Sequence, residues 1–344
     1  MYELTVSSSS GDYAVNIGPG TFAAVVPDGD VCFVADRRFE SLVGGPAAWV
    51  DADEEHKTVG YAERLMEQLA AAGVRRDTTL VAVGGGVVQD LATLVASLYM
   101  RGLEWRYAPT TLMAMADSCI GGKSSLNVGG FKNLAGNFHP PQAIAVDPTF
   151  LETLPETDLV AGLGECAKIA FCRGPESFAR YVALQTPLRS GDRGAASALL
   201  HHVLDAKRWF IEVDEFDHAE RRQLNFGHTF GHALEAATGF ALPHGVAVIL
   251  GMRCAIRLAP EPSLASALDS HCAELLAGVS DLGKRLADLD RERFWQAFHA
   301  DKKHRSGELH LILPASGGAT HEVPLPDDGA TRRAVLDAVE AVVA

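Results

Sequence analysis

Three histidines have the residue type and spacing that suit metal chemistry. The segment NFGHTFGHALEAATGFALPHG carries His228, His232 and His244. Residues four apart on a helix share a face, so His228 and His232 can point the same way. This spacing fits a metal-binding pair, but it also fits ordinary surface or core histidines, and it lacks the glutamate of the HExxH zinc motif. A further ligand would have to come from elsewhere in the chain.

Glu165, in the segment GLGECAK, is the candidate for that further ligand. An acid flanked by glycines at the start of an otherwise apolar helix is an unusual choice for a core. It could instead be a partly exposed helix acid paired with Lys168 or Arg173. Nitrogen and oxygen ligands with open positions suit Zn²⁺ or a similar divalent ion that polarises a hydroxyl or a ketone.

A triple glycine follows a predicted strand. TLVAV leads directly into Gly84, Gly85 and Gly86, after which a helical pattern begins. Bare backbone N–H groups at a helix N-terminus can receive a pyrophosphate, although such a triplet can also be only a tight turn. Asp90, one helical turn further on, and Asp36, which ends the strand VCFVAD, could each meet a ribose hydroxyl or serve only as a first-turn acid.

Basic residues lie among glycines between residues 101 and 139. Arg101, Lys123 and Lys132 occur there with GGKSS and GGFKN, which combine flexible backbone with hydrogen-bond donors. This composition favours a site for a small anion, although lysines are exposed most of the time. Further cations follow in the second half of the chain: Lys168, Lys207, Arg221, Lys302 and Lys303.

The elements that must position these residues differ between the two halves of the chain. In the first half, strand patterns (YAVNIG, VCFVAD, TLVAV, AIAVD) alternate with helical patterns (YAERLMEQLAAAG, LATLVASLYM), which predicts a parallel sheet with helices packed on it. Beyond Pro148 helical periodicity dominates, and ELHLILP at 308–314 is the strand pattern identified there. We therefore predict an α/β domain at 1–150 and a mostly helical domain at 151–344, with a loop at 190–194.

Composition excludes several classes of partner. The 344 residues carry a formal net charge of −14, which argues against a broad surface for nucleic acid or anionic membrane. The six cysteines form no CxxC pair, which predicts neither a zinc ribbon nor a disulfide scaffold and favours a reducing compartment. The start of the chain lacks a signal-peptide pattern, and no apolar stretch reaches the roughly 18 residues of a membrane span. These features predict a cytoplasmic enzyme.

Several segments in one order resemble the sugar phosphate cyclases, of which the 3-dehydroquinate synthases are the best-known members. The segments are GGGVVQDLATLVASLYMRG, PTTLMAMADSCIGGKSSLN, FKNLAGNFHPPQAIAVD, FLETLPETDLVAGLGECAK, DAKRWFIEVDE, NFGHTFGHALEA, PHG and DKK. The resemblance is dense from about 80 to 250 and thinner outside. It implies an N-terminal NAD-binding, Rossmann-like α/β domain and a mostly helical C-terminal domain.

Roles follow from the resemblance residue by residue. It implies that Glu165, His228 and His244 bind the divalent metal, Zn²⁺ or Co²⁺, and that His232 faces the substrate instead of the metal. The NAD⁺ residues would be Asp36, Gly84, Gly85, Gly86, Asp90, Thr110, Thr111, Lys123 and Lys132. The substrate residues would be Asp117, Lys123, Lys132, Asn133, Lys168, Lys207, Arg221 or Arg222, Asn225, His232 and Lys302 or Lys303. Arg101 would reach the phosphate in a neighbouring subunit, which implies a homodimer.

The implied reaction closes a phosphorylated heptulosonate into a carbocycle. NAD⁺ oxidises a hydroxyl transiently, phosphate is eliminated, and an internal aldol step closes the ring. Three departures from the family pattern leave the substrate open: Gln89 replaces a glycine, Ser124-Ser125 replaces Thr-Gly, and PHGVAV lacks an acid. The alternatives are a sister cyclase of the 2-epi-5-epi-valiolone, 2-deoxy-scyllo-inosose or amino-dehydroquinate type, a metal-dependent polyol dehydrogenase, and a cofactor-binding protein without catalysis.

Overall fold

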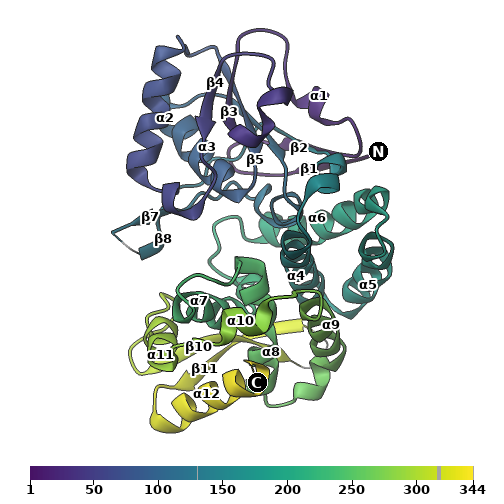
Figure 1. Cartoon of the computed structure of the whole chain (residues 1–344), viewed down its shortest axis with the longest axis vertical. Helices are drawn as coiled ribbons and strands as arrows, with labels where there is room; N and C mark the ends of the chain where they lie inside the picture. The colour runs from purple at the N-terminus through teal and green to yellow at the C-terminus, as the bar shows by residue number, and fades with distance from the viewer. Residues whose placement is uncertain (130, 316–318, 344) are drawn as a thin grey trace. The chain divides into compact units, whose positions relative to one another are not determined.

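A computed structural model describes residues 1–129, 131–315 and 319–343 of the chain (Figure 1). The chain divides into two compact units, one made of Met1–Leu154 with Leu184–Phe216 and the other of Pro155–Ala183 with Asp217–Ala344. The sequence predicted a single division near residue 150. Residues 184–216 instead group with the first unit, because helix α6 (Ala196–Val213) packs on strands β1 and β2 and on the turn at Ala114–Ser118.

The first unit contains a seven-stranded sheet within the described residues, in the order β1-β2-β9-β6-β5-β3-β4. Strands β1 and β2 pair antiparallel, and the other neighbours pair parallel. The bounds are β1 (Tyr2–Val6), β2 (Tyr13–Ile17), β3 (Val31–Asp36), β4 (Ala47–Val50), β5 (Thr79–Gly84), β6 (Trp105–Pro109) and β9 (Ala143–Val146). A mostly parallel sheet with helices on it is the predicted Rossmann-like architecture.

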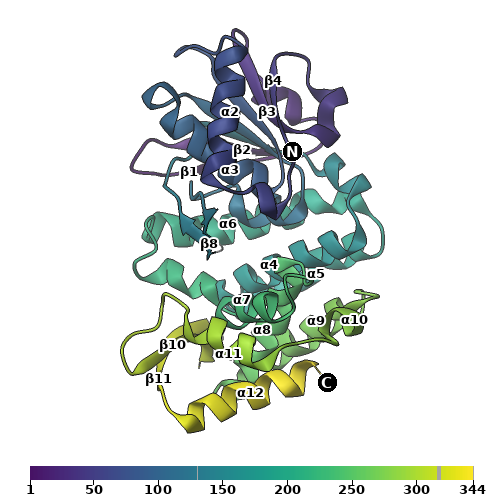
Figure 2. The same ribbon diagram turned by 60° about the vertical axis from the view of Figure 1, so that its left-hand side comes forward.

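Both faces of this sheet are covered, which explains the continuous apolar runs of β3 and β5. Helices α2 (Val59–Ala71) and α3 (Gly86–Leu98) lie side by side over the sheet (Figure 2). On one face, Phe33, Val81 and Val83 belong to an apolar cluster that includes Val25 of the short helix α1 (Phe22–Val25). The carboxyl ends of β3, β5 and β6 lie next to one another because these strands are parallel neighbours.

A small antiparallel pair, β7 (Leu126–Val128) and β8 (Phe131–Ala135), carries the second lysine-containing segment of the first unit. It is tied to the segment before α2 by the backbone bond from Asn127 N to Lys57 O, 2.8 Å. Helix α5 (Pro175–Arg189) runs across the boundary of the two units in sequence.

The second unit is built around helix α8 (His244–Leu258), which contacts α4, α7, α9, α12 and β10. A helix that is apolar on nearly all sides must be enclosed by others, and GVAVILGM is almost entirely buried. The other elements are α4 (Glu156–Arg173), α7 (His228–Ala237), α9 (Ser266–Leu276), α10 (Leu282–Leu286), α11 (Arg291–His299), α12 (Gly329–Val343), β10 (Glu308–Ala315) and β11 (Ala319–Pro326).

The strand prediction for the chain was incomplete. ELHLILP is β10 as predicted, but the expectation of one strand in the second half is wrong, because β11 pairs antiparallel with it. Two prolines, Pro324 and Pro326, argue against a strand in this segment, so β11 was not predicted. A two-stranded pair tolerates proline because each strand has an open edge, where no backbone N–H is needed for pairing. In the first half β1, β4, β6, β7 and β8 were also missed.

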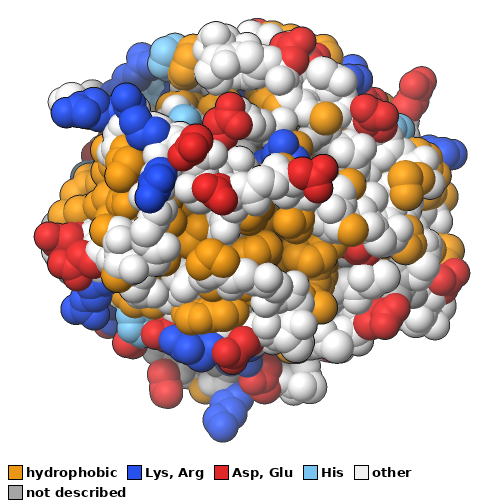
Figure 3. Space-filling model, turned by 90° about the horizontal axis from the view of Figure 1, so that it is seen from above, with side chains coloured by type: hydrophobic (Ala, Val, Ile, Leu, Met, Phe, Trp, Pro, Cys, Tyr) orange, Lys and Arg blue, Asp and Glu red, His pale blue; other side chains and the backbone are white. Residues whose placement is uncertain are grey.

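Short helical turns complete the described part of the chain. They are 3-10 helices at Arg37–Leu42, Glu54–His56, Tyr99–Arg101, Pro148–Thr153, Arg193–Ala195, Glu220–Asn225 and Pro262–Ala265, and a π-helical turn at Ala114–Ser118. The helices of the described residues include none that is both long and apolar enough to cross a lipid bilayer. On the face shown in Figure 3, basic and acidic side chains are intermixed around a central apolar area.

Candidate functional site

The second unit brings together the three predicted metal ligands from three helices. Glu165 lies in the middle of α4, whereas His228 and His244 are the first residues of α7 and α8. Both histidine Nε2 atoms lie 3.7 Å from Glu165 Oε1. Two ligands bound to one tetrahedral ion at Zn²⁺ distances lie about 3.3–3.6 Å apart, so these separations suit a shared divalent cation.

Glycines beside the ligands allow the helices to approach this closely. A Cβ on Gly245, next to His244, would lie 2.2 Å from the backbone oxygen of Ala161 in α4. A Cβ on Gly164, next to Glu165, would lie 2.4 Å from the Ile249 side chain of α8. Gly227, which precedes His228, has a φ of +78°, a conformation that glycine adopts without strain. The glycines are therefore part of the geometry of the site.

Glu165 is a buried carboxylate that lacks hydrogen bonds. It is 1% exposed, and neither of its oxygens has a hydrogen-bond partner among the described residues. Lys168 Nζ lies 2.5 Å from Oε2 as an ion pair, three residues along the same helix. A buried charge without hydrogen bonds is costly. Lys168 offsets this cost at Oε2, and a divalent cation at Oε1 would offset the rest, so the residues present fit a metal ion.

The other ring nitrogen of each histidine faces an acceptor. His228 Nδ1 lies 3.3 Å from the carbonyl oxygen of Phe226, and His244 Nδ1 lies 3.2 Å from Glu235 Oε2. Carbonyl and carboxylate oxygens only accept, so in each ring, when neutral, Nδ1 carries the proton and Nε2 keeps a lone pair. A lone pair at Nε2 is what metal ligation requires.

The pKa values of the two histidines move in opposite directions. Burial, together with the charge of Lys168 and the two neighbouring histidines, holds the pKa of His228 well below its ordinary value. Burial also acts to lower the pKa of His244, but the hydrogen bond and charge of Glu235, and then the charge of Glu165, outweigh it and raise that pKa. Both effects follow from the same cluster of buried ionisable groups.

His232 lies beside the Glu165 cluster rather than in it. Its ring stacks on that of His244 at a centroid distance of 5.5 Å, and its nearest set of possible ligands is Glu235 with His244. Although His232 is exposed to solvent, desolvation by the surrounding protein and the charge of the neighbouring His244 lower its pKa to about 4. The helical spacing alone had suggested His228 and His232 as a metal pair, whereas the structure groups His228 with Glu165 and His244.

The cationic candidates of the second unit are distinguished by their contacts. Arg222 bonds to Glu322 of β11 through two nitrogens, at 3.0 and 3.2 Å, whereas the side chain of Arg221 is buried. Asn225 donates to the carbonyl of Arg222 at 3.0 Å. Lys302 is exposed. Lys303 pairs with Asp301 at 2.6 Å, and its charge is among the causes of the lowered His232 pKa.

The glycine turn of the first unit lies between the ends of β5 and β6. Thr110 N donates to Gly84 O at 3.0 Å, and a Cβ on Gly85 would lie 3.1 Å from the Thr111 side chain. The buried Tyr107 hydroxyl donates to the carbonyls of Gly84 and Gly85 at 3.0 and 3.2 Å, and burial holds its pKa well above the ordinary value. Gly86 begins α3, so backbone N–H groups face the turn as predicted.

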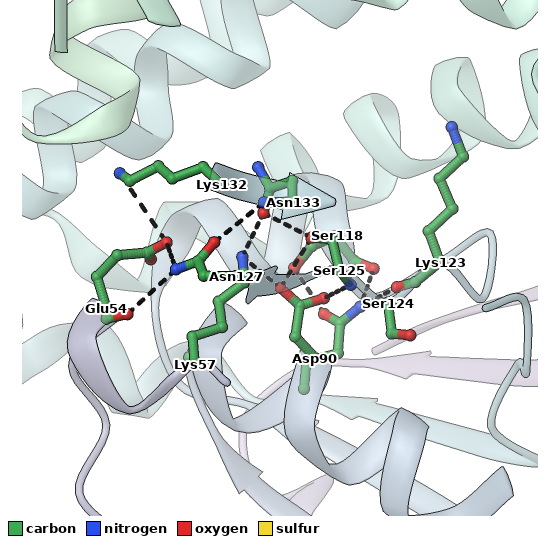
Figure 4. Close-up of polar contacts among 12 residues, drawn as sticks. Glu54, Lys57, Asp90, Ser118, Lys123, Ser124, Ser125, Asn127, Lys132 and Asn133 are labelled. Atoms are coloured by element: carbon green, nitrogen blue, oxygen red, sulfur yellow. Dashed lines mark hydrogen bonds and ion pairs between the residues drawn. The ribbon is translucent and has the colours of Figure 1, made fainter. Parts of the chain in front are cut away.

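Asp90 has more partners than its sequence position suggested. Its carboxylate accepts from Lys57 Nζ at 2.7 Å and from Ser125 N at 3.0 Å, and Ser125 Oγ lies 3.3 Å from it (Figure 4). Lys57 Nζ and Ser125 Oγ also donate to Asn133 Oδ1, both at 2.9 Å. Burial raises the pKa of Asp90, against the charge of Lys57. Asp90 and Asn133 therefore belong to one polar network.

The two lysines of the glycine-rich segments lie differently. Lys132 Nζ is 3.9 Å from Glu54 Oε1, which also accepts from Asn127 Nδ2 at 2.9 Å. The Lys123 side chain points away from the Asp90 network (Figure 4) and lies 5.7 Å from the Phe138 ring centroid. Gln89, which is 2% exposed, fixes this part of the loop: its Nε2 donates to Ser118 O at 2.7 Å, and Ser118 Oγ donates to its Oε1 at 2.6 Å.

The remaining predicted residues of the first unit lie in three places. Lys207 of α6 is 5% exposed and pairs with Asp117 Oδ1 at 2.6 Å; it also bonds to the Asp117 carbonyl. Arg101 is exposed, in a turn where Met100 and Arg101 have φ values of +49° and +70°. Asp36 accepts from Arg38 side-chain nitrogens at 2.9 and 2.6 Å and caps the following helical turn.

Sequence reasoning missed five residues of these networks. They are Glu54, Lys57, Gln89, Tyr107 and Glu235. Glu235 is the one with a usable signal, because it lies three residues after His232 and seven after His228 on the same helical stripe. Lys57 and Glu54 meet Asp90 and Lys132 only through the pairing of distant segments.

The fold and the second-unit cluster together define a class. A parallel sheet with a glycine turn, joined in one chain to a helical unit with a Glu-His-His cluster, is the architecture of NAD- and metal-dependent enzymes. The 3-dehydroquinate synthase N-terminal model matches residues 47–161, and the C-terminal model of the same family matches residues 162–304. The chain belongs to the 3-dehydroquinate synthase family. It is a carbocycle-forming sugar phosphate cyclase that depends on NAD⁺ and a divalent metal.

Curated relatives agree with this assignment. The 3-dehydroquinate synthase of Streptococcus pneumoniae (strain Taiwan19F-14) is 38% identical over 277 residues, covering 80% of this chain and 78% of the relative. The 3-dehydroquinate synthase of Rhodospirillum rubrum (strain ATCC 11170) is 36% identical over 340 residues, covering 90% of this chain and 88% of the relative.

Solved structures of other cyclases share the fold. A 2-epi-5-epi-valiolone synthase from Streptomyces hygroscopicus subsp. jinggangensis 5008, with NAD⁺ and Zn²⁺ bound, has a TM-score of 0.78 and 28% identity, covering 98% of both chains. A probable glycerol dehydrogenase from Sinorhizobium meliloti 1021 has a TM-score of 0.63 at 17% identity, covering 96% of both chains; this likeness shows the fold alone.

Proposed function

We propose that this chain converts 3-deoxy-arabino-heptulosonate 7-phosphate into 3-dehydroquinate and inorganic phosphate. The geometry that carries the proposal is the buried Glu165 carboxylate without hydrogen bonds, with two histidine Nε2 atoms 3.7 Å from its Oε1. The substrate class rests on the family, whose curated members cover most of the chain.

The reaction has no net oxidation, and most of the protein's work is positioning. When bound, NAD⁺ supplies a reversible oxidation of a ring hydroxyl, and the divalent ion held by Glu165, His228 and His244 polarises the reacting oxygen. We assign the base in the elimination to the substrate's own phosphate, so the side chains orient the sugar instead of removing that proton.

The cations of the second unit have separate proposed roles. Arg221 or Arg222 would bind the substrate carboxylate, because a guanidinium suits bidentate carboxylate binding; in this structure Arg222 also holds Glu322. Lys302 or Lys303 would contact the substrate; Lys303 pairs with Asp301 at 2.6 Å, whereas Lys302 is exposed. Lys168, Asn225 and His232 complete the proposed substrate contacts of this unit.

The first unit carries the proposed cofactor residues and further substrate residues. The turn at Gly84, Gly85 and Gly86, with Thr110 and Thr111, would bind the NAD⁺ pyrophosphate, and Asp90 and Asp36 would bind ribose hydroxyls. Lys57 and Glu54 join this set because they contact Asp90 and Lys132. The remaining proposed substrate or cofactor contacts here are Asp117, Lys123, Lys132, Asn133 and Lys207.

The test compares three sugars. Purified chain with NAD⁺ and Co²⁺ or Zn²⁺ is incubated separately with 3-deoxy-arabino-heptulosonate 7-phosphate, sedoheptulose 7-phosphate and glucose 6-phosphate. Phosphate release, the carbocyclic product and NADH absorbance are followed. We expect rapid phosphate release from the heptulosonate alone, with no accumulation of NADH.

The other outcomes are distinct. Turnover of sedoheptulose 7-phosphate or glucose 6-phosphate instead would keep the cyclase class and overturn the substrate. Steady NADH accumulation without phosphate release would indicate a polyol dehydrogenase. A probable glycerol dehydrogenase shares the fold of this chain.

We further propose that the chain acts as a cytoplasmic homodimer. The support is the family resemblance, in which Arg101 reaches the phosphate bound by a neighbouring subunit. Arg101 is exposed, and the adjoining Met100 is also exposed in a left-handed conformation. Positive φ values are strained for residues other than glycine, and such strain is often found at functional sites. The strained turn is therefore consistent with a functional role for Arg101.

A further inference from the structure

Helix α7 presents three ionisable side chains along one stripe. His228, His232 and Glu235 occupy positions i, i+4 and i+7, which lie on the same helical face. Glu235 is 4% exposed, so its carboxylate is buried at the end of this stripe. An acid in a helix is ordinarily exposed, and a buried one needs a partner to offset its desolvation.

The partner of Glu235 is the metal-ligand candidate His244. Glu235 Oε2 lies 3.2 Å from His244 Nδ1, while His244 Nε2 lies 3.7 Å from Glu165 Oε1 on the other side of the ring. The imidazole of His244 is therefore held between two buried carboxylates. His228 differs, because its Nδ1 faces the uncharged carbonyl of Phe226 at 3.3 Å.

The backbone of Glu235 also shapes the path of the chain to His244. Its carbonyl accepts from Phe240 N at 2.7 Å and from the Thr238 hydroxyl at 3.2 Å. These bonds close the turn that leads from α7 to the start of α8. The backbone of this position thus helps to form the turn, while the Glu235 side chain faces Nδ1 of His244.

We propose that Glu235 is a positioning residue for the metal ion, acting through His244. Its carboxylate holds the proton on Nδ1 and the ring plane in place, so the Nε2 lone pair stays directed at the position shared with Glu165 and His228. Carboxylates in this role increase the basicity of the ligating imidazole, and their loss typically weakens metal binding about 10- to 100-fold. Glu235 would not contact the ion itself.

The same side chains could instead form a second metal site that includes Glu235 itself. Ligand atoms of His232, Glu235 and His244 all lie within 4.8 Å of one another, so they could hold a cation of their own. That would require His244 to give up the Nδ1 proton that faces Glu235 while Nε2 remains directed at Glu165. The two arrangements predict different metal stoichiometries: one ion per chain for the positioning role and two for a separate site.

The experiment measures metal binding without NAD⁺ or sugar. Metal-free full-length chain is titrated with Co²⁺ against a chromophoric chelator, and the visible ligand-field spectrum of bound Co²⁺ is recorded. The variants are Glu235→Gln, which keeps an acceptor oxygen without the charge, and Glu235→Ala, which removes both. Asp269→Asn is the matched control, because Asp269 is also a partly buried acid of the second unit but pairs with Arg253 and Arg257.

We expect one Co²⁺ per wild-type chain, affinity about 10- to 100-fold weaker in Glu235→Ala, a smaller loss in Glu235→Gln, and a changed ligand-field band in both. Asp269→Asn should match the wild type. Circular dichroism verifies folding, and the nearly isosteric Glu235→Gln keeps the comparison valid where Glu235→Ala does not fold. Wild-type affinity and an unchanged spectrum in the folded variants would overturn the inference, as would two ions per wild-type chain.

The inference rests on the proposed metal site but not on the proposed substrate. A wild-type chain that binds no Co²⁺ would defeat both the metal site and the role of Glu235. A chain that binds Co²⁺ with the expected dependence on Glu235, yet releases no phosphate from any of the three sugars, would defeat the proposed reaction and leave the role of Glu235 supported.

Discussion

Buried charges in the described part of the chain are arranged in pairs and small networks, and Glu165 belongs to one of these pairs through Lys168. Asp90 with Lys57, and Asp117 with Lys207, each have a charged partner within 2.7 Å. Glu165 has Lys168 Nζ 2.5 Å from its Oε2, while its Oε1 lies 3.7 Å from two histidine nitrogens and has no hydrogen bond among the described residues. The Oε1 side of this carboxylate is therefore where a bound cation would add to the stability of the fold.

The pair of Lys207 and Asp117 allows a test of this principle at single residues. Lys207→Met leaves the Asp117 carboxylate, which is 22% exposed, without its ammonium partner. We expect a loss of about 2 kcal/mol in the free energy of unfolding, less than for a fully buried pair because water still reaches Asp117. Adding Asp117→Asn should recover roughly half of that loss, since the unpaired charge is gone.

Urea unfolding of the wild type, both single variants and the double variant measures this coupling. If Asp117→Asn instead adds its own loss to that of Lys207→Met, the two residues do not interact in the way the 2.6 Å distance implies.

At the scale of elements, close helix contacts in the second unit bring the metal-ligand candidates together. Helix α8 approaches α4 beside Gly245 and approaches α7 beside Gly251, where a Cβ would lie 2.1 Å from the Gly227 oxygen. These neighbours are backbone atoms, which cannot rotate away as a side chain can. The spacing of the three helices therefore depends on residues that carry no functional group.

Gly245→Ala should separate α8 from α4 and weaken metal binding without altering any ligand. The new Cβ would lie 2.2 Å from Ala161 O, so we expect a loss of about 3 kcal/mol in stability and a weaker affinity for Co²⁺. Gly283→Ala in α10 is the control, because nothing lies within 4 Å of its Cβ position. Thermal unfolding and Co²⁺ titration measure both effects; wild-type values in Gly245→Ala would contradict the prediction.

Helices α8 and α9 are joined by an ion pair whose contribution depends on pH. Burial alone would raise the pKa of Asp269, but hydrogen bonds from Arg253 and Arg257, at 2.8 and 3.0 Å, outweigh it and lower that pKa. A carboxyl whose folded pKa lies below the unfolded value of about 3.9 stabilises the protein above that value and loses this effect as the pH falls through the folded pKa.

Asp269→Asn should therefore lower the free energy of unfolding by about 1 kcal/mol at pH 7, and the difference from the wild type should shrink below about pH 4. Urea unfolding from pH 7 to pH 3 measures the difference. A difference that stays constant over this range would mean that the carboxylate charge contributes nothing.

At the scale of the whole molecule, the proposed homodimer makes a prediction about mixed subunits. If Arg101 acts in the neighbouring subunit, Arg101→Ala and His228→Ala chains should each be inactive alone. Co-refolded in equal amounts, they should recover about a quarter of the wild-type activity, because half of the dimers are mixed and each mixed dimer restores one of its two sites.

Phosphate release by the mixture, with each variant alone as a control, measures the recovery. No recovery, together with native mass spectrometry of differently tagged chains that shows mixed dimers, would place Arg101 in its own subunit. A monomeric wild-type chain by light scattering would remove the basis of the prediction.

The sequence by itself determined the fold class and most of the candidate residues, because both are encoded locally. Alternating strand and helix periods, the glycine triplet after a strand, and Glu165, His228 and His244 in ordered motifs need no tertiary information. Only the tertiary structure decided which residues meet. It placed Lys57 on Asp90, put Glu235 beside His244, assigned Arg222 to Glu322, and grouped residues 184–216 with the first unit. Such contacts join segments that are far apart in the chain. The sequence of one segment carries no periodic pattern that identifies its distant partner.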